Sequence, residues 1–171
     1  MGALSKPGRS PAADPEVRPT RYSSFMRKVA CLLVLSLGSL LAEKKAINPP
    51  EFAPKPGAAA PLFSPGILAD GTLYVAGQIG RDLKTGDIPA DFEAEAKNCL
   101  ENIGVVLKAA GMGYQDAVSV QVYLTDIDLF PKMNAIYATY FKEPRPARTT
   151  VGVSRLAAPK ARIEITVTAR K

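Results

Sequence analysis

The clearest hydrophobic pattern of the chain lies between Asp91 and Ala110, where apolar side chains recur every three to four residues. This spacing predicts an amphipathic helix, and Gly111 is well suited to end it. The apolar stripe consists of Phe92, Ala96, Cys99, Leu100, Ile103, Val106, Leu107 and Ala110. We interpret this stripe as core packing rather than as a ligand site.

A second helical pattern follows Asp126 and Asp128, either of which can cap the start of a helix. We expect this helix to run to about Phe141, because Pro144 and Pro146 prevent its continuation. Its predicted inner side carries Leu129, Met133, Ile136, Tyr137 and Tyr140.

Alternating and β-branched stretches predict strands near residues 66–69, 72–76, 117–124, 148–156 and 161–169. Asp70-Gly71 between the first two is a hairpin signal, because glycine adopts positive φ without strain. We expect Gly77 to Gly80 to break the second strand and residues 84–87 to form a turn. The order β-β-α-β-α-β-β predicts an α+β fold, with two helices on one face of a mixed sheet.

A sheet covered by helices on one face leaves its other face uncovered. Val118, Val120 and Val122, or their neighbours, are candidates to line the core of an oligomer on that face. The sequence therefore predicts self-association.

The first 42 residues differ in composition from the rest of the chain. Residues 1–25 are rich in Pro, Ser and Arg and lack apolar periodicity, which predicts disorder. Arg27 and Lys28 then precede a largely apolar run that ends at Ala42, a pattern typical of a secretory signal peptide. The run is short for a membrane span, and a buried core helix is the alternative. The expected signal peptide would be preceded by an unusually long charged region if translation starts at Met1, and by a short one if it starts at Met26.

We call residues 1–42 the leader. We expect a periplasmic or secreted protein with no membrane span after processing, and a cytoplasmic one if the leader is not recognised as an export signal. Residues 43–59 form a Pro-rich, extended lead-in. We expect ordered structure to begin near Phe63, in a domain that spans residues 60–171.

The charge of the chain is concentrated in its leader. Residues 1–42 carry a net charge of +4 out of a total of +6, which leaves +2 for residues 43–171. This near-neutral balance argues against nucleic acid as a partner. The chain contains no histidine and two cysteines, Cys31 and Cys99, so the sequence offers no metal site. We interpret Cys99 as a small buried hydrophobe rather than as a nucleophile.

Two charged side chains on the last predicted strands are the candidates for chemistry. Arg148 follows Pro144 and Pro146 at the entry to a strand, and arginine can hold a carboxylate through two parallel hydrogen bonds. Glu164 stands in an otherwise β-branched strand, where a carboxylate can take a proton from water. The alternatives are a solvated arginine at a strand edge and a glutamate on a wet strand face.

Gly77 is a third candidate, because a glycine that ends a strand lets a ligand approach the backbone. The alternative for this position is a bulge or turn without a ligand.

Several stretches of residues 60–171, taken together, resemble the reactive intermediate deaminase family, also called the Rid, YjgF or endoribonuclease L-PSP family. The matching stretches are Pro61–Gly66, Ala76–Gly80, Asn98–Ile103, Val122–Asp126, Met133–Tyr137, Pro146–Thr150 and Ile163–Ile165. They occur in the family's order and cover the whole predicted domain. The resemblance implies a chorismate-mutase-like fold and a homotrimer with three clefts between subunits.

The resemblance further implies hydrolysis of 2-imino acids, such as 2-iminopropanoate and 2-iminobutanoate, to 2-keto acids and ammonia without a cofactor. In that family Arg148 corresponds to the arginine that binds the substrate carboxylate, and Glu164 to the glutamate that positions the attacking water. Gly77 corresponds to the glycine whose backbone faces the ligand. The resemblance also makes Phe63, Asn134 and Thr150 substrate-binding residues.

Two of these positions differ from many members of the family. Phe63 stands where many have a tyrosine, and Thr150 where many have a cysteine, so a thiol-dependent mechanism is excluded. Both changes affect the expected range of substrates. Two other hypotheses remain: a non-catalytic trimer that binds small carboxylates, and a ribonuclease. The near-neutral charge and the absence of histidine argue against a ribonuclease.

Overall fold

The structure is a computed structural model that describes residues 43–54 and 56–171. The predicted disordered leader and signal peptide over residues 1–42 lie outside these described residues. Within the described part, no helix is both long and apolar enough to cross a membrane.

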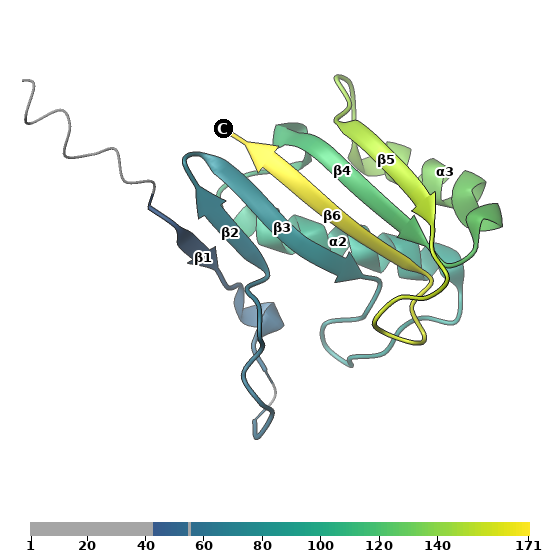
Figure 1. The fold of residues 1–171 in the computed structure, drawn as a ribbon, viewed down its shortest axis with the longest axis horizontal. Helices are drawn as coiled ribbons and strands as arrows, with labels where there is room; N and C mark the ends of the chain where they lie inside the picture. Colours follow the sequence, from purple (N-terminus) through teal and green to yellow (C-terminus); the bar gives the residue numbers. More distant parts are fainter. Residues whose placement is uncertain (1–42, 55) are drawn as a thin grey trace, which may run out of the picture. The chain divides into compact units, whose positions relative to one another are not determined.

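A six-stranded mixed sheet forms the frame of the domain (Figure 1). Its strands are β1 (Lys45–Ile47), β2 (Gly66–Ala69), β3 (Thr72–Ile79), β4 (Ala117–Leu124), β5 (Ala147–Gly152) and β6 (Ile163–Arg170). Their order across the sheet is β1-β2-β3-β6-β4-β5. Neighbouring strands are antiparallel except β4 and β5, which are parallel.

Two helices, α2 (Phe92–Ala109) and α3 (Phe130–Tyr140), lie on one face of this sheet, behind it in Figure 1. The Asp91 carboxylate caps α2 by accepting a hydrogen bond from the backbone N–H of Ala94 at 2.8 Å. The predicted α+β class, with two helices on one face of a mixed sheet, is confirmed.

Tight turns appear where the sequence predicts them. Asp70 and Gly71 both have positive φ, 47° and 71°, as a two-residue hairpin loop between twisted strands requires. Gly111, just beyond α2, has a φ of 70° and donates its N–H to the carbonyl of Lys108 at 2.9 Å.

The hydrophobic core lies between the sheet and the two helices. The predicted stripe is buried in it except for Ala110, which is partly buried, and Cys99, Ile103, Val106 and Leu107 have no exposed surface. The sheet contributes Leu73, Val75, Val120, Val122, Leu124, Ile163, Ile165, Val167 and Ala169. Burying each such aliphatic side chain contributes about 1.5–3 kcal/mol relative to leaving it exposed.

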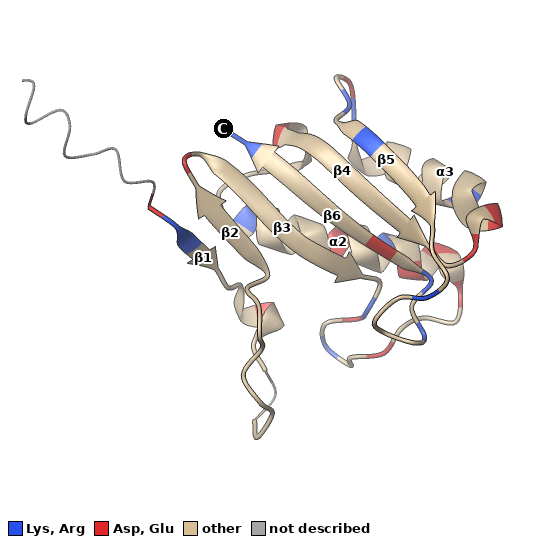
Figure 2. Cartoon of the chain, viewed as in Figure 1, with Lys and Arg blue, Asp and Glu red and all other residues tan. Residues whose placement is uncertain are grey.

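The prediction that Val120 and Val122 line an oligomer core is wrong, because both valines face the helices and are fully buried. Val118 is 49% exposed, next to an irregularity in the pairing of β4 with β6. The neighbours of the valines occupy the uncovered face: Ser119, Gln121 and Tyr123 on β4, opposite Thr168, Thr166 and Glu164 on β6. Figure 2 shows few charged residues along β3, β4 and β6.

Several predicted boundaries differ from the structure. The lead-in contains a strand that the sequence patterns did not predict, since β1 pairs with β2, so ordered structure begins well before Phe63. Asp126 caps a separate 3-10 turn at Ile127–Leu129, and α3 begins after it at Phe130. β3 does not break at Gly77 but continues through a bulge to Ile79.

Candidate active site

Arg148 lies on β5, where it pairs with Val120 of the neighbouring strand β4. Its side chain extends over α3: the guanidinium carbon is 4.6 Å from the centre of the Tyr137 ring and 5.6 Å from that of Phe130. Both distances are within the range of cation–π attraction. Arg148 therefore belongs to the helix-covered side of the sheet, although the residue itself is exposed at the sheet edge.

The Arg148 side chain lines a cavity of about 700 Å³, which we call the arginine cavity. It is lined by Ile127, Asp128, Phe130, Pro131, Arg148 and Thr150. The hydroxyl of Thr150 is buried and has no hydrogen-bond partner among the described residues. Asn134 lies on α3 four residues after Phe130 and three before Tyr137, a spacing that places it on the same side of the helix.

Glu164 is the second residue of β6 and stands between Ile163 and Ile165, which are both fully buried against the helices. Because strand side chains alternate, the Glu164 carboxylate points away from this core. It pairs with Tyr123 of β4 on one side and with Ile79 of β3 on the other. Glu164 itself is half-buried.

Gly77 lies directly beneath this carboxylate. A Cβ added at Gly77 would overlap the Oε1 of Glu164 and would lie 2.9 Å from its carboxyl carbon. The regular pairing of β3 with β6 is interrupted between Val75 and Gln78, so the bulge displaces Gly77 from the ladder. Glycine at this position lets the Glu164 carboxyl group lie against the backbone.

Glu164 and Gly77 line a second space of about 360 Å³, which we call the glutamate cavity. Its lining consists of Phe52, Pro61, Phe63, Pro65, Gly77, Gln78, Ile79, Arg81, Asn102, Ala157, Ala158 and Glu164. Phe63 is 66% exposed, so its ring forms an open wall of this cavity.

The predicted site residues thus fall into two groups within one chain. Phe63, Gly77 and Glu164 line the glutamate cavity, while Arg148 and Thr150 line the arginine cavity. Asn134 belongs to α3, the helix that borders the arginine cavity. Within the described residues, Arg148 and Glu164 therefore line different cavities.

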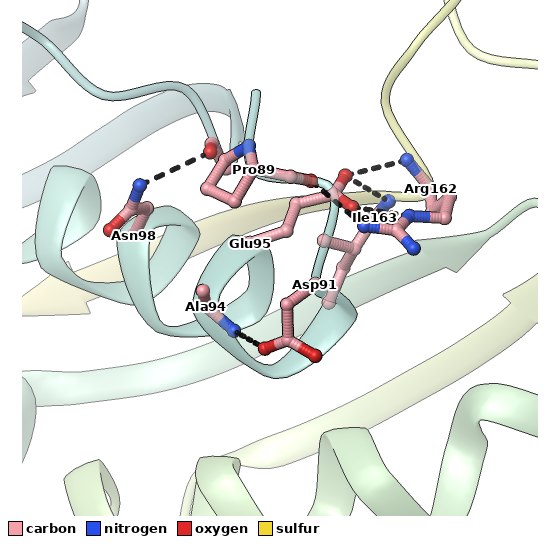
Figure 3. Close-up of polar contacts among 8 residues, drawn as sticks. Pro89, Asp91, Ala94, Glu95, Asn98, Arg162 and Ile163 are labelled. Carbon is pink, nitrogen blue, oxygen red and sulfur yellow. Dashed lines mark hydrogen bonds and ion pairs between the residues drawn. The ribbon is translucent and has the colours of Figure 1, made fainter. Parts of the chain in front are cut away.

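A partly buried ion pair holds the start of β6, and sequence patterns alone did not reveal it (Figure 3). Glu95 of α2 is fully buried and accepts hydrogen bonds from the backbone N–H and the Nε of Arg162, both at 2.6 Å. Arg162 also donates from Nη2 to the carbonyl of Pro89 at 3.0 Å. The available signal was the position of Glu95 within the apolar stripe, three residues after Phe92.

Polar side chains of α2 also hold the end of β3, next to Gly77. The Cys99 thiol donates to the carbonyl of Gln78 at 3.0 Å, and the Asn102 amide donates to the carbonyls of Ile79 and Arg81 at 3.0 and 2.8 Å. Burial raises the pKa of the Cys99 thiol, which keeps it neutral. Cys99 is therefore a packed, inert residue, as the sequence predicts.

No cluster of three or more cysteine, aspartate or glutamate side chains that could hold a metal ion occurs in residues 43–54 and 56–171. The arginine cavity is lined by Arg148 and Asp128 and the glutamate cavity by Arg81 and Glu164, so each cavity offers one guanidinium and one carboxylate among largely apolar walls. Such a pair can bind an anionic group and accept a proton from water.

The family model "Endoribonuclease L-PSP" matches residues 53–171. The chain belongs to this family. Among its relatives is the 2-iminobutanoate/2-iminopropanoate deaminase of Rattus norvegicus, 44% identical over 113 residues, which cover 65% of this chain and 81% of that enzyme. The enzyme of the same name from Homo sapiens is 44% identical over 115 residues, 66% of this chain and 82% of that enzyme.

Solved structures of the endoribonuclease L-PSP family share the fold. The YjgF gene product of E. coli superposes with a TM-score of 0.66 at 35% identity, over 74% of this chain and 98% of that one. The Rid family protein YyfA of Yersinia pestis gives a TM-score of 0.68 at 37% identity, over 75% of this chain and all of the other. The resemblance to the Rid and YjgF proteins is therefore confirmed.

Proposed function

We propose that this chain hydrolyses 2-imino acids of the 2-iminopropanoate and 2-iminobutanoate type to 2-keto acids and ammonia. The observation that carries the proposal is the glutamate cavity. There Gly77, which has no side chain, leaves room for the Glu164 carboxylate to face an open, largely apolar space. The names of the rat and human relatives support the same substrate class.

The proposed chemistry needs few groups, because the carbon of an imine is already electrophilic. Arg148 binds the substrate carboxylate through two N–H groups and so orients the C=N bond. Glu164 takes a proton from a water molecule, whose oxygen forms a bond to the imine carbon. The C=N bond becomes a single bond as the nitrogen takes this proton from Glu164, and the new hydroxyl group then gives a second proton to the nitrogen through the same carboxylate. The C–N bond then breaks, which releases ammonia and leaves the carbonyl of the keto acid.

We further propose that the complete site forms between copies of the chain, as a homotrimer with three clefts. In this arrangement the arginine cavity of one copy closes over the glutamate cavity of the next copy. The uncovered sheet face, with Ser119, Gln121 and Tyr123, supplies a surface for the assembly. Each cleft then combines Arg148 of one subunit with Glu164 of another.

The first experiment measures imine hydrolysis directly. An amino-acid oxidase generates 2-iminobutanoate in the presence of semicarbazide, and the protein competes with semicarbazone formation. We expect Arg148→Ala to lower kcat/KM by about 10²-fold or more, because charged hydrogen bonds to the carboxylate are lost. We expect Glu164→Gln to lower kcat by about 10²–10⁴-fold, since the proton acceptor is removed.

Arg145→Ala is the matched control, because Arg145 is close in the sequence but pairs with Glu143 on the surface. It should retain the activity of the unmodified protein. Unchanged turnover in Arg148→Ala would refute the proposed role of Arg148. Stabilisation of the protein by 2-ketobutyrate without any imine turnover would instead support a carboxylate-binding module.

A further inference from the structure

The Arg148 side chain forms no hydrogen bond and no ion pair with any residue in the described part of the chain. Two other arginines behave differently: Arg162 pairs with Glu95, and Arg145 with Glu143. Asp128 lines the arginine cavity as well, yet it makes no ion pair with Arg148. Within the described residues, none of the N–H groups of the Arg148 guanidinium therefore donates a hydrogen bond to the protein.

Aromatic rings hold this guanidinium in place of a carboxylate. Its carbon lies 4.6 Å from the ring centre of Tyr137 and 5.6 Å from that of Phe130, two residues of α3. A cation over an aromatic ring gains about 0.5–1 kcal/mol at an exposed site and about 2 kcal/mol where it is desolvated. The rings attract the charge without using any of its N–H groups.

Tyr137 is itself rigidly placed. Only 4% of its surface is exposed, and its ring stacks on that of Phe141 with centres 4.3 Å apart and an angle of 27° between the planes. A ring fixed in this way restricts the rotamers of the long arginine side chain above it. Restricting that motion before binding lowers the entropy lost when a ligand is bound.

We propose that Tyr137, supported by Phe130, is a positioning residue that holds the Arg148 guanidinium flat and leaves its N–H groups free for the substrate carboxylate. This inference rests on the proposed function of Arg148. A carboxylate partner at this place would neutralise the arginine and compete with the substrate for the same donors. An aromatic platform orients the arginine and avoids both effects.

The hydroxyl of Tyr137 has no part in this role. It is buried and finds no hydrogen-bond partner within residues 43–54 and 56–171. Burial raises the pKa of Tyr137, an effect that the nearby charges of Arg148 and Arg145 oppose. The ring therefore acts as a neutral surface at neutral pH. Phenylalanine would preserve that surface and remove only an unpaired polar atom.

The test compares Tyr137→Leu with Tyr137→Phe in the full chain. We expect Tyr137→Leu to raise the KM for 2-iminobutanoate about tenfold with a smaller change in kcat, because orientation of the carboxylate is weakened. The dissociation constant of 2-ketobutyrate, measured by calorimetry, should rise by a similar factor. Tyr137→Phe should stay within about twofold of the unmodified protein in both measurements.

Tyr140→Leu is the matched control, because Tyr140 lies on the same helix and contacts Tyr114 rather than Arg148. It should change neither constant. Unchanged KM and dissociation constant in Tyr137→Leu would overturn the proposal, and so would equal damage in Tyr137→Phe, which would assign the effect to the hydroxyl.

If Tyr137→Leu fails to fold, Phe130→Leu decides the question, since Phe130 is only partly buried at the edge of the core. We expect it to weaken 2-ketobutyrate binding about threefold, and an unchanged constant contradicts the inference. If the unmodified protein shows no imine turnover, the proposed function is refuted but the inference about Tyr137 is not. The effect of Tyr137 on 2-ketobutyrate binding can still be measured.

Discussion

At the scale of single residues, the contact between Gly77 and Glu164 is the most demanding feature of the site. A side chain at position 77 must push the Glu164 carboxyl group aside, since a Cβ there would overlap its Oε1. We expect Gly77→Ala to lower kcat/KM for imine hydrolysis about 10²-fold, because displacing a reacting group by about 1 Å has an effect of that order. Steady-state kinetics with semicarbazide competition measure it.

Gly152→Ala is the control for this substitution. A Cβ at Gly152 would meet its nearest neighbour, the Cβ of Ile127, at an ordinary 3.7 Å. Its activity should be unchanged. If Gly77→Ala and Gly152→Ala had the same activity, catalysis would not depend on the present position of the Glu164 carboxylate.

Cys99 makes the stability of the fold depend on pH. The folded protein keeps this thiol protonated because burial raises its pKa, while the unfolded chain releases the proton above about pH 8.5. The folded state then binds more protons than the unfolded state, so the free energy of unfolding falls as pH rises. One such group contributes at most about 1.4 kcal/mol per pH unit.

Cys99→Ser isolates this contribution, since serine can donate to the Gln78 carbonyl in the same way but does not titrate. Urea unfolding at pH 8 and pH 10, with a reductant present, should show a shallower decline for Cys99→Ser. Identical declines for the two proteins would contradict the assigned cause.

Sequence reasoning singled out candidate residues for the chemistry but could not predict their surroundings. Arg148 and Glu164 stand out because each is a charge at an informative strand position, and the family resemblance assigned them roles. The rings of Tyr137 and Phe130 near Arg148 depend on how β5 packs on α3, which no local pattern encodes. Glu95 escaped notice because its partner, Arg162, is 67 residues away in the chain.

At the scale of elements, side chains of α2 form hydrogen bonds near both strands that line the glutamate cavity, β3 and β6. Asn102 and Cys99 bind the end of β3, and Glu95 binds Arg162 directly before β6. Glu164 follows Arg162 by two residues, so the ion pair fixes the part of β6 from which the carboxylate extends.

Glu95→Gln tests this connection. Its Oε1 can still accept from the Arg162 backbone, but its amide group would face the Nε donor of Arg162. We expect a loss of about 2 kcal/mol or more in the free energy of unfolding, measured by urea denaturation, because a buried pair loses one charge. Glu101→Gln, in a surface pair with Lys97 at 3.8 Å, should cost no more than about 0.5 kcal/mol. Similar losses in the two variants would exclude a special role for Glu95.

Element prediction succeeded where periodic patterns were long. The 18 residues of α2 repeat the apolar pattern over five helical turns. The capping residue and the terminal glycine predict the same helix bounds as the apolar stripe. β1 has only three residues, too few for an alternating pattern, and Pro49 and Pro50 follow it closely in the chain. It is a strand because β2 offers it an unpaired edge, a tertiary cause that is invisible locally.

At the scale of the whole molecule, the proposal of a site between copies rests on where the two charged groups lie. Glu164 points away from the helix-covered core, whereas Arg148 lies over α3 on the helix-covered side. The two cavities share no lining residue. The proposed cleft would therefore draw the two groups from different copies, and mixing inactive variants tests this proposal.

Arg148→Ala and Glu164→Gln should each be inactive alone, yet activity should return when the two are unfolded together and refolded as a mixture. With random assembly of equal amounts, about a quarter of the clefts receive an intact arginine from one variant and an intact glutamate from the other. The recovered kcat should approach that fraction of the unmodified value. Refolding each variant separately and then combining them without exchange is the control. A mixture that stays inactive after verified exchange of subunits would place both groups in a site formed by one chain, and would exclude the shared cleft.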